Sequence, residues 1–175
     1  MDNANPNVIE GRNIWQFGDN YNADLIVGSA HISTTDRDVL GRVCLTDYDP
    51  EFPSKVRAGD VMVAGGNFGY GHPHYQCIVS LQANGIGALI AESFYPMWYR
   101  VAVFYAFPAL VCPGISTAAK VGDVLRADIA TGRVENLTTG AVLQGEPVPP
   151  VVLEIMRDGG LPKHLKKRVA ARAAA

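Results

Sequence analysis

The chain has 175 residues, of which 48% are hydrophobic and 18% charged, and its formal net charge at pH 7 is -2. This length suffices for one well-buried domain and leaves little for a second. The near-neutral charge gives no reason to expect nucleic acid or an anionic membrane as a partner. No apolar run approaches the roughly 18 residues that span a bilayer, and the N-terminus lacks the basic-then-apolar order of a signal peptide, so we expect a cytoplasmic location.

The first third of the chain is polar and rich in turn-forming residues. Residues 13–18 alternate well enough to form a first strand, and a helix is expected from Thr35 or Asp36 to Cys44. The loop between them holds four side chains that can bond nearby backbone or face a ligand, and both roles stay open: Asp19, Asn20, Asn22 and Asp24. His31, isolated among Ser and Thr, is more typical of a surface or capping group than of a catalyst.

The middle of the chain predicts a strand, a helix and a second strand. Residues 61–65 form a short apolar run bounded by glycine, residues 75–84 have helical periodicity and end at Gly85, and residues 86–93 are apolar again. This order predicts a βαβ unit with a helix-length crossover. In open sheets of this kind, active groups gather where a strand leads into the following helix.

That position is occupied by a glycine-rich loop with two imidazoles. His72 and His74 flank Pro73, and several glycines precede them and allow a close approach of the backbone. A helix start offers free N–H groups and positive potential, which suits an anionic ligand.

Residues 94–112 are dense in aromatic side chains and contain one arginine, Arg100. A buried, unpaired guanidinium is costly, so we expect Arg100 either to snorkel to solvent or pair with a structural partner, or to bind an anionic ligand. Residues 108–112 are expected to form a third strand.

From Val121 onward, short alternating segments separated by Thr-Gly turns predict antiparallel hairpins, a β-rich half packed as a lid on the βαβ core. An amphipathic helix over residues 151–157, a Gly-Gly stop and a basic helical tail follow. The charge run over residues 163–172 is typical of a solvated face, with partner docking as the alternative.

The three cysteines Cys44, Cys77 and Cys112 are scattered and flanked by apolar residues. No two of them have the spacing of metal ligands, so we expect buried thiols rather than disulfides or ligands. An iron or zinc centre, if the function needs one, is therefore expected outside this chain.

Taken together, these segments resemble a known family. The segments that carry the likeness occur in one order along the chain: GDNYNADLI, DYDPEF, AGDVMVAGGNFGYG, GIGALIAESF, WYR, FPAL, TGRVENLTTG and EIMRDGGLPKHLKKR. They resemble the small subunit of 3-isopropylmalate dehydratase, the swivel domain of the aconitase superfamily. The resemblance implies an α/β swivel fold with a mixed sheet, in a single domain over residues 11–168 between tails at 1–10 and 169–175.

The resemblance also implies a partner and a cofactor. It implies that the chain caps the active site of a separate large subunit, in a heterodimer whose large subunit carries a 4Fe-4S cluster. The implied reaction is the reversible addition or removal of water at a small organic hydroxy acid.

The likeness fails at the catalytic loop. The family loop reads Gly-Cys-Gly-Ser-Ser-Arg-Glu-His, with the first serine as base and the arginine gripping a substrate carboxylate, whereas residues 69–76 here read Gly-Tyr-Gly-His-Pro-His-Tyr-Gln. The family's Asp-Thr-Asp, its Tyr-Leu-x-Thr specificity loop and its Arg-Asn-Ala-Ile-Asn stretch become residues 22–24, 31–34 and 100–104. Imidazole cannot reproduce the bidentate fork of arginine, so a substrate with one fewer carboxylate or a bulkier apolar group is expected.

We therefore expect a hydro-lyase subunit with an altered substrate. His72 stands where the serine base stood, and a histidine at a helix start is a natural general base. His74 would orient His72 or bind the substrate. The remaining substrate-binding candidates are Asp24, His31, Tyr70, Gly71 and Arg100.

Two alternatives stay open. The chain could be a non-catalytic or regulatory subunit that keeps only the docking surface. His-x-His is also a ligand spacing for a mononuclear metal, although no third ligand can be placed.

Overall fold

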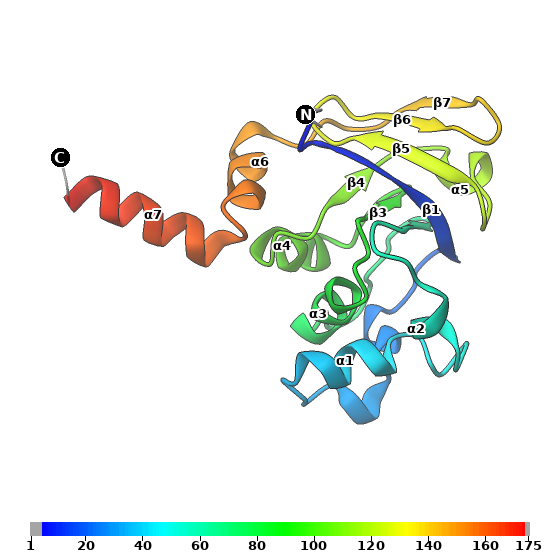
Figure 1. The fold of residues 1–175 in the computed structure, drawn as a ribbon, viewed down its shortest axis with the longest axis horizontal. Coiled ribbons are helices and arrows are strands. Elements are labelled where there is room, and N and C mark those ends of the chain that lie inside the picture. The colour runs from blue at the N-terminus through cyan, green and yellow to red at the C-terminus, as the bar shows by residue number, and fades with distance from the viewer. Residues whose placement is uncertain (1–4, 174–175) are drawn as a thin grey trace.

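A computed structural model describes residues 5–173 (Figure 1). Seven strands form one mixed sheet in the order β4-β3-β2-β1-β5-β6-β7. The strands are β1 (Val8–Phe17), β2 (Val61–Ala64), β3 (Ala88–Ala91), β4 (Ala109–Val111), β5 (Val124–Asp128), β6 (Arg133–Asn136) and β7 (Val142–Gln144). The helices are α1 (Arg37–Val43), α2 (Phe52–Lys55), α3 (Tyr75–Ala83), α4 (Pro96–Phe104), α5 (Ile115–Ala118), α6 (Pro150–Arg157) and α7 (Leu161–Ala173), with 3-10 turns η1 (Ala23–Ile26) and η2 (Ser29–His31).

Strand β1 joins the two halves of the sheet. Its C-terminal part pairs in parallel with β2, and its N-terminal part pairs antiparallel with β5. The expected βαβ unit is confirmed, because β2 and β3 are parallel neighbours connected by α3. The hairpins β5 to β7 are also confirmed. They are not a separate lid, however, because β1 makes them part of the same sheet.

Strand β1 also bears on the expected domain limits. It begins at Val8, inside the segment expected to be a tail, and α7 continues to Ala173, beyond the expected domain end at residue 168. The limits of the domain stay a prediction.

The central strands are buried on both faces, which explains their continuous apolar runs. In β2, Met62 and Ala64 pack into one core with α1, α3 and α4. Val61 and Val63 pack into a second core with α5, β5 and β6. The antiparallel half therefore packs over the second face of the βαβ core.

The helix boundaries follow local chemistry. Asp36 caps α1, as predicted, and its Oδ1 accepts hydrogen bonds from the N–H groups of Asp38 and Val39. Helix α4 was not predicted. It begins with Pro96 in its first turn and buries only Trp98 and Ala102, so it lacks the polar cap and the broad apolar stripe that identify a helix in sequence.

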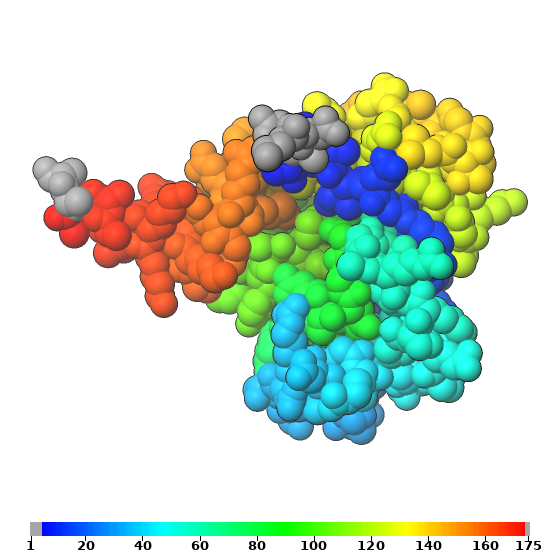
Figure 2. All heavy atoms as spheres, viewed as in Figure 1, coloured from blue at the N-terminus to red at the C-terminus, as the bar shows by residue number. Residues whose placement is uncertain are grey.

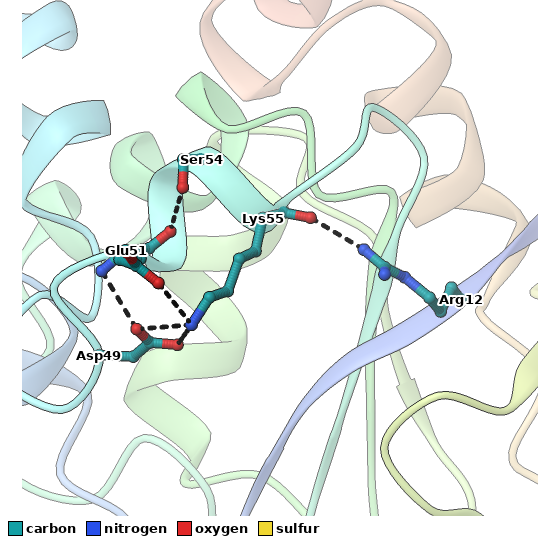
Figure 3. A network of polar contacts seen from close by, with 5 residues as sticks. All are labelled: Arg12, Asp49, Glu51, Ser54 and Lys55. Atoms are coloured by element: carbon teal, nitrogen blue, oxygen red, sulfur yellow. Dashed lines mark hydrogen bonds and ion pairs between the residues drawn. The ribbon is translucent and has the colours of Figure 1, made fainter.

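A hydrogen bond joins the end of α2 to the central strand β1 (Figure 3). Lys55 pairs with Asp49 at 2.6 Å and with Glu51 at 3.5 Å, and its carbonyl oxygen accepts a hydrogen bond from Arg12 of β1. This connects the proline-rich segment before β2 to β1.

Helix α7 projects from the body (Figures 1 and 2), and His164 is its buried residue. His164 Nδ1 and Lys167 Nζ contact the two carboxylate oxygens of Asp158 at 2.7 and 2.6 Å. Within residues 5–173, no helix is both long enough and apolar enough to cross a bilayer.

Candidate functional site

The glycine-rich loop lies at the carboxyl ends of β1, β2 and β3. Gly69 has φ +85°, and a Cβ at this position would overlap the side chain of the buried Trp98 on α4. Glycine is therefore required here for two reasons, the left-handed backbone and the space. The loop backbone at Gly69 consequently packs directly against Trp98, in the first turn of α4.

Backbone contacts hold the loop between its two neighbours. The N–H of Gly69 donates to the carbonyl of Tyr21 at 3.0 Å, and Asn22 and Tyr70 form an isolated bridge. On the other side, the N–H of Phe68 donates to the carbonyl of Ser93 at 3.0 Å. Hydrogen bonds thus connect the loop after β2 to the loop after β1 and to the segment after β3.

The main polar contact of the site joins His74 to Asp24. His74 is the N-cap of α3, Asp24 lies in η1 after β1, and Nδ1 of His74 is 2.9 Å from Oδ1 of Asp24. The side chain of His74 is 44% exposed and that of Asp24 is 19% exposed. A carboxylate that accepts from Nδ1–H selects the tautomer with a bare Nε2, the form that can take up a proton.

Asp24 has two further contacts that fix its position. The Sγ of the buried Cys77 lies 3.7 Å from the same Oδ1, and the side-chain oxygen of Asn22 accepts from the Asp24 N–H at 3.0 Å. Asp24 is therefore a partly buried carboxylate presented to an accessible imidazole, an arrangement suited to general acid–base catalysis.

His72 is placed differently. It is exposed, and its side chain makes no hydrogen bond to any residue between 5 and 173. We expected His74 to orient His72, but no hydrogen bond joins the two side chains in the described chain, and Nδ1 of His74 contacts Asp24 instead. The base role of His72 stays a prediction.

Of the substrate-binding candidates, Asp24, Tyr70 and Gly71 come together with His74. Tyr70 is 54% exposed and meets Tyr95 edge to face, with ring centroids 6.2 Å apart. The loop that carries His74 therefore also presents an exposed tyrosine, which packs against the half-buried Tyr95.

His31 and Arg100 are not joined to this group. His31 ends η2, and within residues 5–173 its side chain makes no hydrogen bond or ion pair to the loop. Arg100 is exposed on α4, and its Nη1 lies 3.7 Å from the sulfur of Met97. The exposed guanidinium carries no burial cost that would require a structural partner, and its role as an anion ligand stays a prediction.

The family's polar stretch at residues 100–104 does not form one wall of this site. Phe104 lines a different cavity, of about 600 Å³, together with Gly85 and Ile86 at the far end of α3. Helix α4 begins after Tyr95, next to the loop. Within residues 100–104, Arg100 is therefore closest to the loop.

Four residues of the site were missed or left undecided in the sequence. Asp19 Oδ1 accepts from the N–H of Gly66 at 2.7 Å, Asn67 Nδ2 donates to Asn20 Oδ1 at 2.9 Å, and Ser93 Oγ accepts from the N–H of Asn67 at 2.8 Å. For Asp19 and Asn20 this favours the turn role over a ligand-facing one. The available signal was the asparagine inside a glycine-rich loop, a residue type that tolerates left-handed backbone.

The chain's own donors do not suit an iron–sulfur cluster. The three cysteines are buried free thiols, as predicted. Burial raises the pKa of Cys44 to about 12 and that of Cys112 to about 11, and it also raises the pKa of Cys77, whereas a ligand must be a thiolate. Between residues 5 and 173, no three His, Cys, Asp or Glu side chains lie close enough together to hold a metal ion.

Comparisons with known proteins agree with the motifs. No protein-family model matches the chain. The chain is 40% identical over 163 residues to the isopropylmalate/citramalate isomerase small subunit of Methanocaldococcus jannaschii, covering 93% of this chain and 96% of the relative. It is 37% identical over 162 residues to the methanogen homoaconitase small subunit of Methanothermobacter thermautotrophicus, covering 93% of each chain.

A solved structure shows the same fold. The crystal structure of 3-isopropylmalate dehydratase from Methanocaldococcus jannaschii superposes with a TM-score of 0.87 at 32% identity, over 95% of this chain and 98% of that one. The swivel-type α/β fold expected from the motifs is thereby confirmed. The chain belongs to the family of 3-isopropylmalate dehydratase small subunits.

Proposed function

We propose that the chain is the small subunit of a two-subunit hydro-lyase that adds or removes water at a small hydroxy acid. The observation that carries this proposal is the similarity along nearly the whole chain to small subunits of isopropylmalate and homoaconitase-type enzymes. Names of this kind imply a large subunit as partner, and the loop over residues 69–74 is the part of this chain that would face its active site.

Proton transfer is assigned to the loop histidines, and the geometry favours His74. Asp24 holds Nδ1 of His74 at 2.9 Å, which leaves Nε2 to accept a proton from a substrate carbon during dehydration and to return one during hydration. His72 has no such support, so its role is to hydrogen-bond the substrate. Exchanged roles for the two histidines are the competing assignment, and single variants separate them.

The other candidates are assigned to binding. Tyr70 and Gly71 would contact the substrate beside His74, and the exposed Arg100 would attract a carboxylate. His31 would join only from the outer rim. Since the loop lacks the family's arginine and carries an exposed tyrosine, we propose a substrate with one fewer carboxylate or a larger apolar group than isopropylmalate.

The iron–sulfur cluster of the family is assigned to the large subunit. When bound there, such a cluster supplies Lewis-acid chemistry to a substrate oxygen. The buried thiols of this chain, with their raised pKa values, are unsuited to hold it. This chain's contribution is therefore proton transfer and substrate orientation.

The test is reconstitution with a large subunit from the same genome, followed by hydration assays on a panel of unsaturated acids. The panel spans one to three carboxylates and short to branched apolar substituents. We expect turnover that requires both chains. The best substrate should differ from the unsaturated acid whose hydration gives isopropylmalate. Absence of any complex between the two chains would refute the proposal.

The non-catalytic alternative predicts a different result. If a complex forms and its turnover is unchanged when His72 and His74 are both replaced by alanine, the chain acts only by docking.

A further inference from the structure

Two asparagines at the ends of neighbouring strands contact each other through their side chains. Asn20 follows β1, Asn67 follows β2, and Nδ2 of Asn67 donates to Oδ1 of Asn20 at 2.9 Å. Both have left-handed backbone, with φ of +52° and +54°. Few non-glycine residues adopt left-handed backbone, and asparagine is one that does. Here two such asparagines also contact each other.

Further contacts tie this pair to three strand ends. The N–H of Asn20 donates to the carbonyl of Gly66 at 2.8 Å, and Gly66 in turn donates to Oδ1 of Asp19 at 2.7 Å. The N–H of Asn67 donates to Oγ of Ser93 at 2.8 Å, beyond the end of β3. We call these four residues, Asp19, Asn20, Asn67 and Ser93, the asparagine clamp.

Each asparagine of the clamp precedes one member of the proton-transfer pair in the chain. Asp24 lies on the loop that leaves Asn20, and His74 lies on the loop that leaves Asn67. The contact between Asp24 and His74 bridges these same two loops. The relative position of the loops therefore determines whether Nδ1 of His74 reaches Asp24.

We propose that Asn20 and Asn67 are positioning residues that set the alignment of His74 with Asp24. The inference rests on the proposed function, because it concerns the residues assigned there to proton transfer. Neither asparagine side chain is hydrogen-bonded to the imidazole, so each acts through the backbone of its own loop.

The competing explanation is that each asparagine serves only its own left-handed turn. Aspartate and glycine separate the two explanations, because both tolerate left-handed backbone and only aspartate keeps a side chain for the contact. In Asn20→Asp, the carboxylate still accepts from Asn67 Nδ2, so the contact is kept. In Asn67→Gly, the left-handed turn is kept and the side-chain contact is lost.

The experiment uses the full-length chain labelled with ¹⁵N-histidine, and NMR reports which ring nitrogen of His74 carries the proton. We expect the Nδ1–H tautomer in the wild type and in Asn20→Asp, and a shift toward the Nε2–H tautomer in Asn67→Gly. In the reconstituted complex, Asn67→Gly should lower kcat about tenfold with KM changed less than about twofold. Asn20→Asp should stay within about twofold of the wild type for both constants.

The outcomes separate this inference from the proposed function. If wild-type His74 lacks the Nδ1–H tautomer, the Asp24–His74 pairing itself is wrong. If the wild type has this tautomer and Asn67→Gly keeps both it and the wild-type kcat, the positioning role is refuted. If Asn20→Asp, which keeps the contact, is as impaired as Asn67→Gly, the side-chain contact is not what aligns His74, and the positioning role is again refuted.

Discussion

Replacement of Gly69 by alanine tests the packing of the glycine-rich loop against Trp98. Gly69 has φ +85°, and its new methyl group would overlap the side chain of Trp98, which is fully buried. Two penalties therefore combine at one position. Left-handed backbone costs an alanine about 1–2 kcal/mol, and overpacking against a buried ring costs about 1–3 kcal/mol more.

Gly122→Ala provides the matched control. Gly122 also has left-handed backbone, with φ +98°, but nothing lies within 4 Å of a Cβ built on it. The control therefore carries the backbone penalty without the overlap. Effects on the unfolded chain are common to both variants and cancel in the comparison.

The assay is urea unfolding followed by circular dichroism, with thermal melting as a second measurement. We expect Gly122→Ala to lose about 1–2 kcal/mol and Gly69→Ala about 2–5 kcal/mol of unfolding free energy. For a domain of this size, each kcal/mol lowers Tm by about 2–4 °C. If Gly69→Ala is no less stable than Gly122→Ala, the loop does not lie against Trp98 and the site geometry is wrong.

Two further predictions concern titrating groups. Burial acts to raise the pKa of Glu92, but hydrogen bonds from Ser116 and Gly114 outweigh it and hold the pKa below its usual range. Stability from this carboxylate is therefore present at neutral pH and lost as the pH falls through the lowered folded-state pKa. Glu92→Gln should lower the unfolding free energy by about 1–2 kcal/mol at pH 7, as measured by urea unfolding. The difference from the wild type should vanish in acid. A difference that does not change with pH would contradict this account. Because burial raises the pKa of all three thiols, Ellman's reagent at pH 8 should react with none of them in the native chain and with three after unfolding. Rapid reaction of a native thiol would show that the core around it is open.

Much of the fold could be predicted because local sequence and tertiary burial agree. Residues 61–65 and 86–91 are continuously apolar, and β2 and β3 are buried on both faces. Helix α1 has its aspartate cap, and α3 begins and ends near its predicted limits. Helix α4 escaped prediction because its aromatic side chains are distributed around the helix, and only the packing shows that Trp98 and Ala102 form the buried side.

The site was less predictable for a physical reason. Asp24 and His74 were both candidates, but they lie 50 residues apart, and their contact depends on β1 being the neighbour of β2. The same strand also pairs with β5, which no local pattern indicates. Sequence could therefore name the residues of the site without pairing them, and so could not identify which histidine has a partner.

Single alanine variants of the two loop histidines, assayed in the reconstituted complex, test the central claim most directly. The account predicts that His74→Ala lowers kcat by about 10²-fold or more, the range of general acid–base catalysis, and that Asp24→Asn follows it in direction. His72→Ala should have a smaller effect that falls mainly on KM. A kcat that is unchanged in His74→Ala, or reduced only in His72→Ala, would contradict the assignment of proton transfer to His74 held by Asp24.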